Sequence, residues 1–578
     1  MKNAMTGAEM IIHALQQEKV GAVFGYPGGS IIDVFDKLYS ADVPFFLTRH
    51  EQAACHAADG YARASGKPGV VITTSGPGAT NIVTGLATAY MDSIPVIAIT
   101  GQVPTHLIGN DAFQEADIVG ITRSITKHNF LVQSVDELPR ILKAAFYIAT
   151  SGRPGPVLVD VPKNVQQART TVPYPESIEI RSYKPTVQGH PQQIKKVAEE
   201  IKRASRPVLY VGGGAVSSGA AEEIRELAEK CDIPVTTTLM GLGIFPETDE
   251  RSLKMLGMHG TVYANYAVQE CDLLIAVGAR FDDRVTGKVE KFAPKAEIVH
   301  IDIDPTTIRK NVQVKLPVVG DVKAVLAELL RIVEPKKHRE WMEQIKEWKK
   351  NYPLYYRENG KIQPQMVVQT VAEMVKHEAI IATEVGQHQM WTAQFYDFVE
   401  PRTFLSSGGL GTMGYGFPAA IGAQIARPDK LVIDMAGDGS IQMNIQELAT
   451  AVLYNIPVKV IIFNNQSLGM VRQWQGMFYN RRFSNTCLRK SKFCPKVCTG
   501  LENAPCPDFY VPDFVKLAEA YSAHGFYAEK PEDVRPTLEK AFSTPGPVFV
   551  EFKIDKEENV YPMVPAGAPL NEMIRGMA

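Results

Sequence analysis

Short runs of apolar residues recur along the chain, each followed by a glycine-bearing or polar turn and then by a stretch with helical spacing of apolar positions. Continuous apolar runs are typical of parallel strands that are covered on both faces, whereas helices repeat apolar residues three or four positions apart. The alternation predicts β-α-β units. The runs lie at 22–25, 43–47, 69–74, 95–100 and 156–160, at 207–211, 272–277 and 298–302, and at 379–383, 431–436, 458–463 and 547–552.

Two polar, proline-bearing stretches, at about 172–191 and about 336–363, divide these runs into three groups. A chain of 578 residues also exceeds the size at which one hydrophobic core stops growing. The sequence therefore predicts an α/β protein with three tandem doubly wound parallel-sheet domains, the first and third similar in architecture. We place these domains at 1–172, 190–336 and 363–555, followed by a C-terminal tail at 556–578.

Composition narrows the classes of function. Hydrophobic residues make up 45% of the chain and the formal net charge is -2, which gives no electrostatic reason to expect binding to nucleic acid or to an acidic membrane surface. Residues 1–19 read as a helix with charges spread through it rather than as a signal peptide, and no apolar run approaches the length of a membrane span. We expect a cytoplasmic protein that acts on small molecules.

The segment 431–465 carries the most specific chemical signal. Gly437-Asp438-Gly439 follows one apolar run, a helix is predicted over 441–453, and Asn464-Asn465 follows the next run. In a parallel sheet both motifs fall at the carboxyl ends of strands, where doubly wound folds bind ligands. Glycine lets a backbone approach a bulky anion, and Asp438 and Asn465 offer the oxygen ligands that Mg2+ prefers. Either motif taken separately is more often a plain turn or loop, but the pair favours a magnesium-bound diphosphate.

Glu51 opens a predicted helix just after the run 43–47. An acidic residue in a first helical turn can merely complement the helix dipole. Two glycine-bearing loops, at 25–30 and 75–81, also stand between a strand and a helix, where a backbone can approach a ligand. Each loop could instead be a bare tight turn, and neither is a dinucleotide fingerprint. Together they favour a ligand-contacting role for Glu51.

At these residues the chain resembles the thiamine diphosphate enzymes, and within them the large catalytic subunits of acetohydroxyacid synthase, also called acetolactate synthase. The resemblance covers nearly the whole chain. Its diphosphate motif is specific for the cofactor class, and its arginine- and tryptophan-bearing motifs indicate the branch. It rests on 24–29, 49–54, 111–115, 278–284, 386–391, 437–439 with 464–465, and 469–475.

The resemblance implies an activity. Glu51 would hydrogen-bond the pyrimidine N1' of the cofactor and favour the imino tautomer, whose 4' nitrogen removes the thiazolium C2 proton. The carbanion would attack a 2-ketoacid, carbon dioxide would leave, and the remaining enamine would add to a second 2-ketoacid. The implied products are 2-acetolactate from two pyruvates and 2-aceto-2-hydroxybutyrate from pyruvate and 2-ketobutyrate, the first common step towards valine, leucine and isoleucine.

The resemblance also assigns residues to this site. Met413 would bend the cofactor, Arg284 and Trp474 would select the second ketoacid, and Lys163 would lie at the substrate entrance. Without the resemblance, these four fit a core methionine, a surface ion pair, a core aromatic and a solvated lysine. Gly28 and Gln114 would join Glu51, and the diphosphate end would contact Gly386, Gln387, His388, Gly411, Gly437, Gly439, Ser440 and Met443, with the backbone carbonyl of Ser467 as a third metal ligand.

The middle domain would hold flavin adenine dinucleotide (FAD) by the same resemblance. Its glycines and acids at predicted strand ends fit the pyrophosphate and ribose of a nucleotide. The run Gly212-Gly213-Gly214 lacks the third glycine of a true dinucleotide motif. The implied flavin residues are Arg153, Gly212, Gly213, Gly214, Met258, His259, Gly260, Gly278, Arg280, Asp302, Ile303, Asp321 and Val322.

The resemblance implies partners as well. In this family the two halves of one site come from different subunits, which implies at least a homodimer, with pairing of dimers into a tetramer left open. A separate small regulatory subunit is a further family partner.

Seven cysteines are present. Cys55, Cys231 and Cys271 are isolated in apolar surroundings and are most simply reduced core thiols. The other four, Cys487, Cys494, Cys498 and Cys506, lie in a basic insertion at 487–506 that most relatives lack. They could bind zinc or an iron-sulfur cluster, form a redox switch, or be reduced thiols in a plain loop, and their spacing matches no standard zinc finger.

Three other functions compete with this interpretation. Glyoxylate carboligase is disfavoured because it lacks the carboxylate of Glu51, and pyruvate oxidase is disfavoured by Arg284 with Trp474. A catalytically silent nucleotide-binding protein would keep the domains, but the intact Glu51, Asp438 and Asn465 argue against it.

Overall fold

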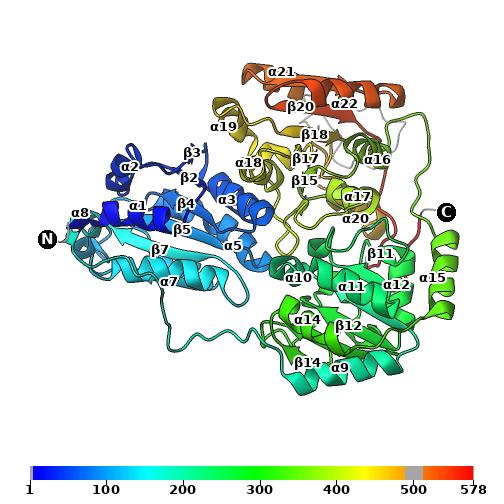
Figure 1. Ribbon diagram of the computed structural model, residues 1–578. Coiled ribbons are helices and arrows are strands. Elements are labelled where there is room, and N and C mark those ends of the chain that lie inside the picture. Colours follow the sequence, from blue (N-terminus) through cyan, green and yellow to red (C-terminus); the bar gives the residue numbers. More distant parts are fainter. Residues whose placement is uncertain (1–3, 489–511, 577–578) are drawn as a thin grey trace.

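The computed structural model describes residues 4–488 and 512–576, which form three α/β domains, each built on a six-stranded parallel sheet (Figure 1). In Figure 1 the first domain is blue to cyan, the central domain green, and the third domain yellow to red. The predicted fold class is confirmed. A small antiparallel pair, β1 (Met5–Thr6) with β8 (Arg169–Thr170), ties the start of the first domain to its end.

The first and third sheets have the same topology, as predicted. Numbered within its domain, each runs in the order 2-1-3-4-6-5, and the order reverses between strands one and three. The first sheet comprises β2 (Val23–Tyr26), β3 (Phe45–Leu47), β4 (Gly69–Thr73), β5 (Val96–Gln102), β6 (His128–Leu131) and β7 (Val157–Pro162). The third comprises β15 (Ile380–Thr383), β16 (Phe404–Leu405), β17 (Val432–Gly437), β18 (Lys459–Asn464), β19 (His524–Ala528) and β20 (Val548–Lys553).

The central sheet runs in the order 3-2-1-4-5-6, so its reversal lies between β9 and β12. Doubly wound sheets bind ligands at such reversals, outside the carboxyl ends of the strands. The strands are β9 (Pro207–Val211), β10 (Val235–Thr237), β11 (Ser252–Met255), β12 (Leu273–Val277), β13 (Glu297–Asp302) and β14 (Leu316–Val319).

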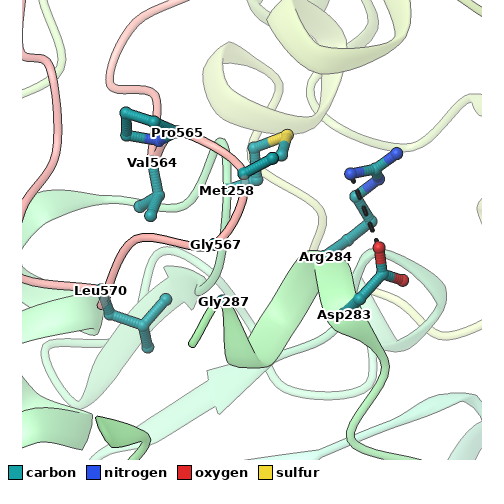
Figure 2. Close-up of a pocket in the computed structure, with 9 residues that line it drawn as sticks. Met258, Asp283, Arg284, Gly287, Val564, Pro565, Gly567 and Leu570 are labelled. Carbon is teal, nitrogen blue, oxygen red and sulfur yellow. Dashed lines mark ion pairs between the residues drawn. The ribbon is translucent and has the colours of Figure 1, made fainter. Parts of the chain in front are cut away.

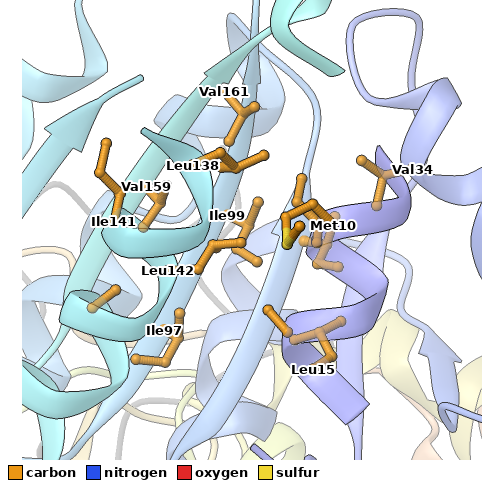
Figure 3. Packing of buried hydrophobic residues seen from close by; sticks show 14 of the residues in the cluster. Met10, Leu15, Val34, Ile97, Ile99, Leu138, Ile141, Leu142, Val159 and Val161 are labelled. Atoms are coloured by element: carbon orange, nitrogen blue, oxygen red, sulfur yellow. The ribbon is translucent and has the colours of Figure 1, made fainter. Parts of the chain in front are cut away.

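Each sheet is covered by helices on both faces, because its central strands are apolar on both sides. In the first domain α1 (Gly7–Gln17) and α7 (Leu138–Thr150) bury one face, packing against Ile97, Ile99 and Val159 (Figure 3). The opposite face is covered by α3 (Glu51–Ser65) and α5 (Val83–Asp92). Residues of β4, β5, β17 and β18 are buried throughout, which explains their continuous apolar runs.

The third domain packs on the first through two helices. Helix α18 (Gly416–Ala426) lies against α3 so closely that a Cβ at Gly422 would overlap the carbonyl oxygen of Ala57, and a Cβ at Gly60 would overlap that of Ala419. Glycine therefore sets the spacing between the two domains at this crossing.

Three sequence predictions need correction in detail. The helix predicted over 441–453 is broken into two 3-10 turns, Ile441–Met443 and Ile445–Glu447, followed by α19 (Leu448–Leu453). The break lies at Asn444, whose φ of -133° is outside the helical range and whose side chain donates to the carbonyl of Gly414 at 2.7 Å.

The first helix begins later than predicted, at Gly7, because Thr6 and Glu9 form a capping box and Met5–Thr6 pair with β8. The stretch 336–363, interpreted as a linker, contains α15 (Arg339–Asn351), which buries Trp341, Met342 and Ile345 against the central domain. Among the described residues no helix is long and apolar enough to cross a membrane. The cytoplasmic location stays a prediction.

Candidate functional site

The strongest candidate site is a pocket at the reversal of the third sheet. Segments following β15, β17 and β18 converge there, as the positions of the predicted motifs required. Of the predicted diphosphate and metal residues, the pocket lining includes Gly386, Gln387, His388, Met413, Gly437, Asp438, Gly439, Ser440, Asn465 and Ser467, together with Val385, Trp391, Phe463, Leu468, Gly469, Met470, Val471 and Ile554. Gly411 and Met443 do not line it; the Met443 side chain is exposed nearby, against Gly414.

Asp438 has the properties of a metal ligand. Its side chain is buried, Oδ1 accepts from the backbone N–H of Gly439 at 3.1 Å, and Oδ2 has no partner. Burial raises the pKa of Asp438 to about 7, against the opposing effect of backbone N–H groups at Gln466, Gly439 and Ser467. A buried, unpaired carboxylate oxygen is costly unless a partner such as a cation satisfies it.

Asn465 completes the donor set for a hard cation. Its Oδ1 accepts from the N–H of Ser467 at 3.0 Å, and its Nδ2 donates to Oε1 of Gln387 at 3.3 Å. Within the described ranges no cluster of three or more His, Cys, Asp or Glu side chains could hold a metal. One carboxylate with an amide oxygen fits Mg2+, which keeps waters and takes further oxygens from phosphates.

His388 offers a neutral imidazole to the same pocket. Burial lowers the pKa of His388 to about 3, and its Nε2 has no hydrogen-bond partner. A Cβ at Gly437 would lie only 2.6 Å from His388 Nδ1, so glycine is required beside the ring. A buried ring nitrogen without a partner beside a glycine backbone fits an anionic ligand.

Glu384 was not predicted, yet it holds the pocket together. This buried carboxylate follows β15 and accepts from Ser440 Oγ at 2.5 Å, from Gly414 N at 2.7 Å and from Phe417 N at 3.1 Å. It therefore joins the diphosphate loop to the loop that carries Met413. An acid directly after the apolar run 379–383 was the available sequence signal.

Glu51, Gln114 and Gly28 gather at the reversal of the first sheet. Glu51 begins α3, and its Oε2 accepts from Asn81 Nδ2 at 2.9 Å, a neighbour that sequence reasoning missed. A Cβ at Gly78 would lie 3.5 Å from Glu51 Oε1, and one at Gly76 would lie 2.8 Å from the carbonyl oxygen of Gln114. The Glu51 carboxylate and the Gln114 backbone thus both lie beside the short helix α4 (Pro77–Thr80).

The loop around Gly28 is close to the same place. A Cβ at Gly28 would lie 2.5 Å from the side chain of Thr74. Lys163 is partly exposed, and its Nζ donates to the carbonyl of Gly29 at 2.6 Å and lies 3.5 Å from Asp33. Lys163 therefore supports this loop.

The two halves of the predicted site are not joined within one chain. All the described residues that line the diphosphate pocket belong to 385–554, so none comes from the first domain. Glu51 is thus not among the residues that line the Asp438 pocket of its own chain.

Arg284 borders a different hollow, between the central domain and the C-terminal tail (Figure 2). It lies on α13 (Asp283–Thr286), its side chain is 56% exposed, and its ion pair is with the adjacent Asp283 at 3.6 Å. The hollow is also lined by Met258, Gly287, Val564, Pro565, Ala566, Gly567 and Leu570. An exposed guanidinium with one weak neighbour is available to a carboxylate ligand.

Trp474 lies on α20 (Gly469–Phe478), whose first residues line the diphosphate pocket. Its indole Nε1 is buried without a hydrogen-bond partner. The tail connects this helix to the Arg284 hollow, because Gln473 Nε2 donates to Val560 O at 3.1 Å and Val564 N donates to Met258 O at 2.8 Å. Arg284 and Trp474 therefore flank the tail from two sides.

In the central domain the predicted glycines meet at the sheet reversal. Gly212 N donates to Val277 O at 2.9 Å, Gly214 N donates to Gly278 O at 3.0 Å, and a Cβ at Gly214 would lie 2.8 Å from Gly278 Cα. At the end of the neighbouring β10, the buried hydroxyls of Thr237 and Thr238 have no partner. Glycines without room for side chains beside unpaired hydroxyls fit a nucleotide.

The other predicted flavin residues lie in different places in the central domain and at its border with the first domain. Arg153 crosses from the first domain to Asp304 at 3.2 Å, beside Asp302, at the carboxyl edge of the central sheet, where Ile303 also lies. Asp321 instead caps α14 (Val322–Ile332) and accepts from Ser218 at 2.8 Å, and Val322 is buried. Arg280 is half-buried, and Asn311 donates to its carbonyl.

The segment Met258-His259-Gly260 faces the tail. His259 Nδ1 lies 3.2 Å from the carbonyl of Pro562, and burial lowers the pKa of His259 to about 4. Of these three residues, Met258 lines the Arg284 hollow, and His259 contacts the tail beside it.

Cys55, Cys231 and Cys271 are buried free thiols, as predicted, and burial raises the pKa of Cys231 to about 11. Cys487 is a half-buried free thiol whose backbone pairs with that of Ser467 in an antiparallel bridge. Cys494, Cys498 and Cys506 lie outside the described residues, so the predicted metal or redox role of the insertion stays a prediction.

Comparison with known proteins identifies related families. Three family models match: the thiamine pyrophosphate enzyme N-terminal TPP binding domain over residues 5–121, the central domain over 194–329, and the C-terminal TPP binding domain over 384–552.

Curated relatives match nearly the whole chain. The acetolactate synthase large subunit of Haemophilus influenzae is 47% identical, covering 99% of this chain and 98% of that protein. The probable acetolactate synthase large subunit of Methanocaldococcus jannaschii is 50% identical, covering 99% and 95%. The acetolactate synthase isozyme 3 large subunit of Escherichia coli is 46% identical, covering 98% of each chain.

Proposed function

The chain belongs to the thiamine pyrophosphate enzymes, in the family of acetolactate synthase large subunits, and we propose that it joins two pyruvates into 2-acetolactate with release of carbon dioxide. We propose 2-ketobutyrate as an alternative second substrate. The single observation that carries this proposal is the third-domain pocket, where an unpaired buried carboxylate oxygen of Asp438 faces the Asn465 loop.

Bound thiamine diphosphate supplies the electron sink through which a 2-ketoacid loses carbon dioxide and transfers its remaining two-carbon unit. Asp438, Asn465 and the carbonyl of Ser467 would hold Mg2+ against its diphosphate, with His388 and Gly386 beside the same group. Met413 would support it from the pocket wall. These residues bind and orient; they exchange no proton with substrate.

Glu51 would hold the proton that the cofactor's aminopyrimidine exchanges. Its Oε2 is already oriented by Asn81, which leaves Oε1 free to meet a ring nitrogen. Such proton exchange contributes about 10²- to 10⁴-fold to catalysis in enzymes. Gln114 lies against Gly76, Gly28 lies against Thr74, and both would contact the same ring.

Selection of the second ketoacid would fall to Arg284 and Trp474. The exposed guanidinium of Arg284 can take a carboxylate in a two-pronged hydrogen bond, and the bulky indole of Trp474, whose Nε1 is unpaired, would limit the size of the alkyl group. Lys163 would support the entrance loop through Gly29.

We propose FAD for the central domain, although joining two ketoacids transfers no net electrons. The Gly212–Gly214 turn against Gly278 supports this, as do the unpaired Thr237 and Thr238 hydroxyls and the strand-end Asp302. Flavin absorbance of the purified protein would test it, since protein prepared without any flavin absorbance would contradict it.

We also propose an assembly of at least two copies. Glu51 does not line the Asp438 pocket of its own chain, which supports a site that is completed by a second copy. The relatives are named large subunits, which supports a separate small regulatory subunit as a further partner. Light scattering of the purified chain would distinguish monomer, dimer and tetramer.

The activity is tested by giving purified protein pyruvate, with or without thiamine diphosphate, Mg2+ and FAD, and measuring acetoin after acid treatment. Product should require thiamine diphosphate and Mg2+. Asp438→Asn removes the charge of the metal ligand and should lower product formation at least ~100-fold, and Glu51→Gln should lower it similarly while cofactor binding persists.

The matched control is Asp429→Asn, which alters an aspartate whose side chain is 60% exposed on the same domain. It should keep full activity. Oxygen uptake without acetoin would indicate a pyruvate oxidase and contradict the proposal, and so would full activity in Glu51→Gln.

A further inference from the structure

The loop at 109–117, which carries Gln114, is held to the first sheet by a buried amide. Gln102, the last residue of β5, donates from Nε2 to the carbonyl of Ala116 at 3.0 Å and to Asp160 Oδ2 at 2.9 Å. Its Oε1 accepts from Val103 N at 2.8 Å. Both amide protons and the amide oxygen are used, so the group cannot turn over without losing these bonds.

Asp160 fixes the orientation of Gln102. It lies on the adjacent strand β7 with 1% exposure, and its Oδ1 accepts from Thr100 Oγ at 2.7 Å. Burial raises the pKa of Asp160 to about 7. In either protonation state Oδ2 can accept from Gln102, because a proton can reside on Oδ1 facing Thr100. The second N–H of Gln102 is thereby directed to Ala116.

The anchored loop controls where Gln114 lies. Gln114 has a φ of 60°, in the left-handed region that non-glycine residues rarely adopt. Its carbonyl stands against Gly76, at the start of the short helix α4, while Asn81 just after α4 holds Glu51. A shift at Ala116, two residues from Gln114, would change the spacing between Gln114 and Glu51.

We propose that Gln102 and Asp160 are positioning residues that hold Gln114 beside Glu51 for the reaction, without touching substrate themselves. The proposal rests on the proposed function, because the role of Gln114 comes with it. Misplacement of a catalytic group by about 1 Å can cost on the order of 10²-fold in rate.

Two variants remove the anchor in different ways. Gln102→Leu deletes the amide, whereas Asp160→Leu removes the carboxylate that orients it. We expect kcat for acetolactate formation to fall ~10- to 100-fold in both, approaching that of Gln114→Ala. Binding of magnesium pyrophosphate, followed by fluorescence of the pocket-lining Trp391, should be unchanged because the third domain is untouched.

The matched control is Asn129→Leu on β6. Asn129 Nδ2 donates to the carbonyl of Val119 at 2.7 Å, which is also an amide anchor in the first domain, but in α6 (Ile118–Thr122) beyond the Gln114 loop. It should lower the melting temperature as the other variants do and keep kcat within twofold. Either anchor variant with kcat within twofold of wild type would overturn the proposal, as would an equal loss of kcat in Asn129→Leu.

The proposed function fails separately. If the wild-type chain forms no acetolactate, the function is wrong; if it does and Gln114→Ala is fully active, the anchored loop has no catalytic residue and the inference is wrong while the function stands.

Discussion

At the scale of single residues, the site depends on buried carboxylates that serve different ends. Asp438 has an oxygen left free for a ligand, while Glu384 uses both oxygens on its own domain. Glu447 reaches across to the first domain: both its oxygens accept from Arg49 N, at 3.0 and 3.1 Å, and Thr450 donates to it at 2.7 Å. Glu447 thus holds the segment directly before Glu51.

Glu447 predicts a pH dependence of stability. Burial raises its pKa from the ordinary 4.5 to about 7, partly offset by Thr450 and by the backbone at Arg49 and His50. The folded state therefore holds this proton more tightly than the unfolded state. Its contribution favours folding fully below about pH 4.5 and is lost as the pH rises through about 7.

Glu447→Gln keeps the acceptor for Arg49 N and never ionises. Between pH 5 and pH 8 the melting temperature of wild type should fall relative to that of Glu447→Gln, and thermal unfolding of both proteins at the two pH values measures this. An equal difference at the two pH values would show that the carboxyl does not titrate between them.

Site residues that are marked by their neighbours in the sequence could be predicted, whereas residues that act through contacts with distant parts of the chain could not. Asp438 and Asn465 were accessible because each directly follows an apolar strand. Asn81 and Glu447 matter through contacts with residues that are distant in sequence, at 30 and 398 positions respectively, and no spacing announces such contacts.

At the scale of elements, the central strands were predictable and most edge strands were not. Buried strands such as β4 and β17 read as continuous apolar runs. Six strands of the three large sheets were missed from the sequence. Five of them, β6, β11, β14, β16 and β19, lie at sheet edges, where one side of the strand has no neighbouring strand and fewer apolar residues are needed. The sixth, β10, is an interior strand of only three residues, too short to form a recognisable apolar run. The broken helix after Gly439 depended on the distant carbonyl of Gly414, which sequence spacing does not reveal.

The close packing of α3 against α18 predicts that a larger residue at Gly422 would destabilise the protein. Gly422→Ala would place a methyl group on the carbonyl of Ala57, in backbone that cannot move without displacing α3 and with it Glu51. Overpacking of this kind costs about 1–3 kcal/mol or more. We expect a lower melting temperature and reduced acetolactate formation.

Gly476→Ala is the matched control. Gly476 lies in α20, and a Cβ there would be at an ordinary contact distance of 3.7 Å from the ring of Phe483. Replacing a helical glycine with alanine at a roomy position stabilises by up to about 1 kcal/mol. If Gly422→Ala melts no lower than Gly476→Ala, the crossing is not closely packed.

At the scale of the whole molecule, a buried ionic network joins the domains around the Met413 loop. Arg63 on α3 donates to Asp59 at 2.6 Å and to Asp92 at 2.9 Å, and all three side chains are at most 5% exposed. Asp92 also accepts from Gly408 N at 3.0 Å and Gly409 N at 2.7 Å, and Tyr415 donates to Asp59 at 2.6 Å. The helix that begins with Glu51 is thereby tied to both ends of the loop that carries Met413.

Replacing Arg63 should lower both the stability of the protein and its affinity for thiamine diphosphate. Arg63→Met would leave two buried carboxylates without their counter-charge, a defect that costs about 3–5 kcal/mol, whereas Arg63→Lys keeps the charge but not the fork and should lie between. Arg331→Met is the control, since that arginine pairs with Glu328 at 2.6 Å but is 71% exposed, and such pairs contribute about 0–1 kcal/mol. The melting temperature should be highest for Arg331→Met, intermediate for Arg63→Lys and lowest for Arg63→Met. Trp391 fluorescence should also show weaker binding of thiamine diphosphate to Arg63→Met, because the Met413 loop loses its anchor. Equal melting of Arg63→Met and Arg331→Met would mean that the network does not couple the domains.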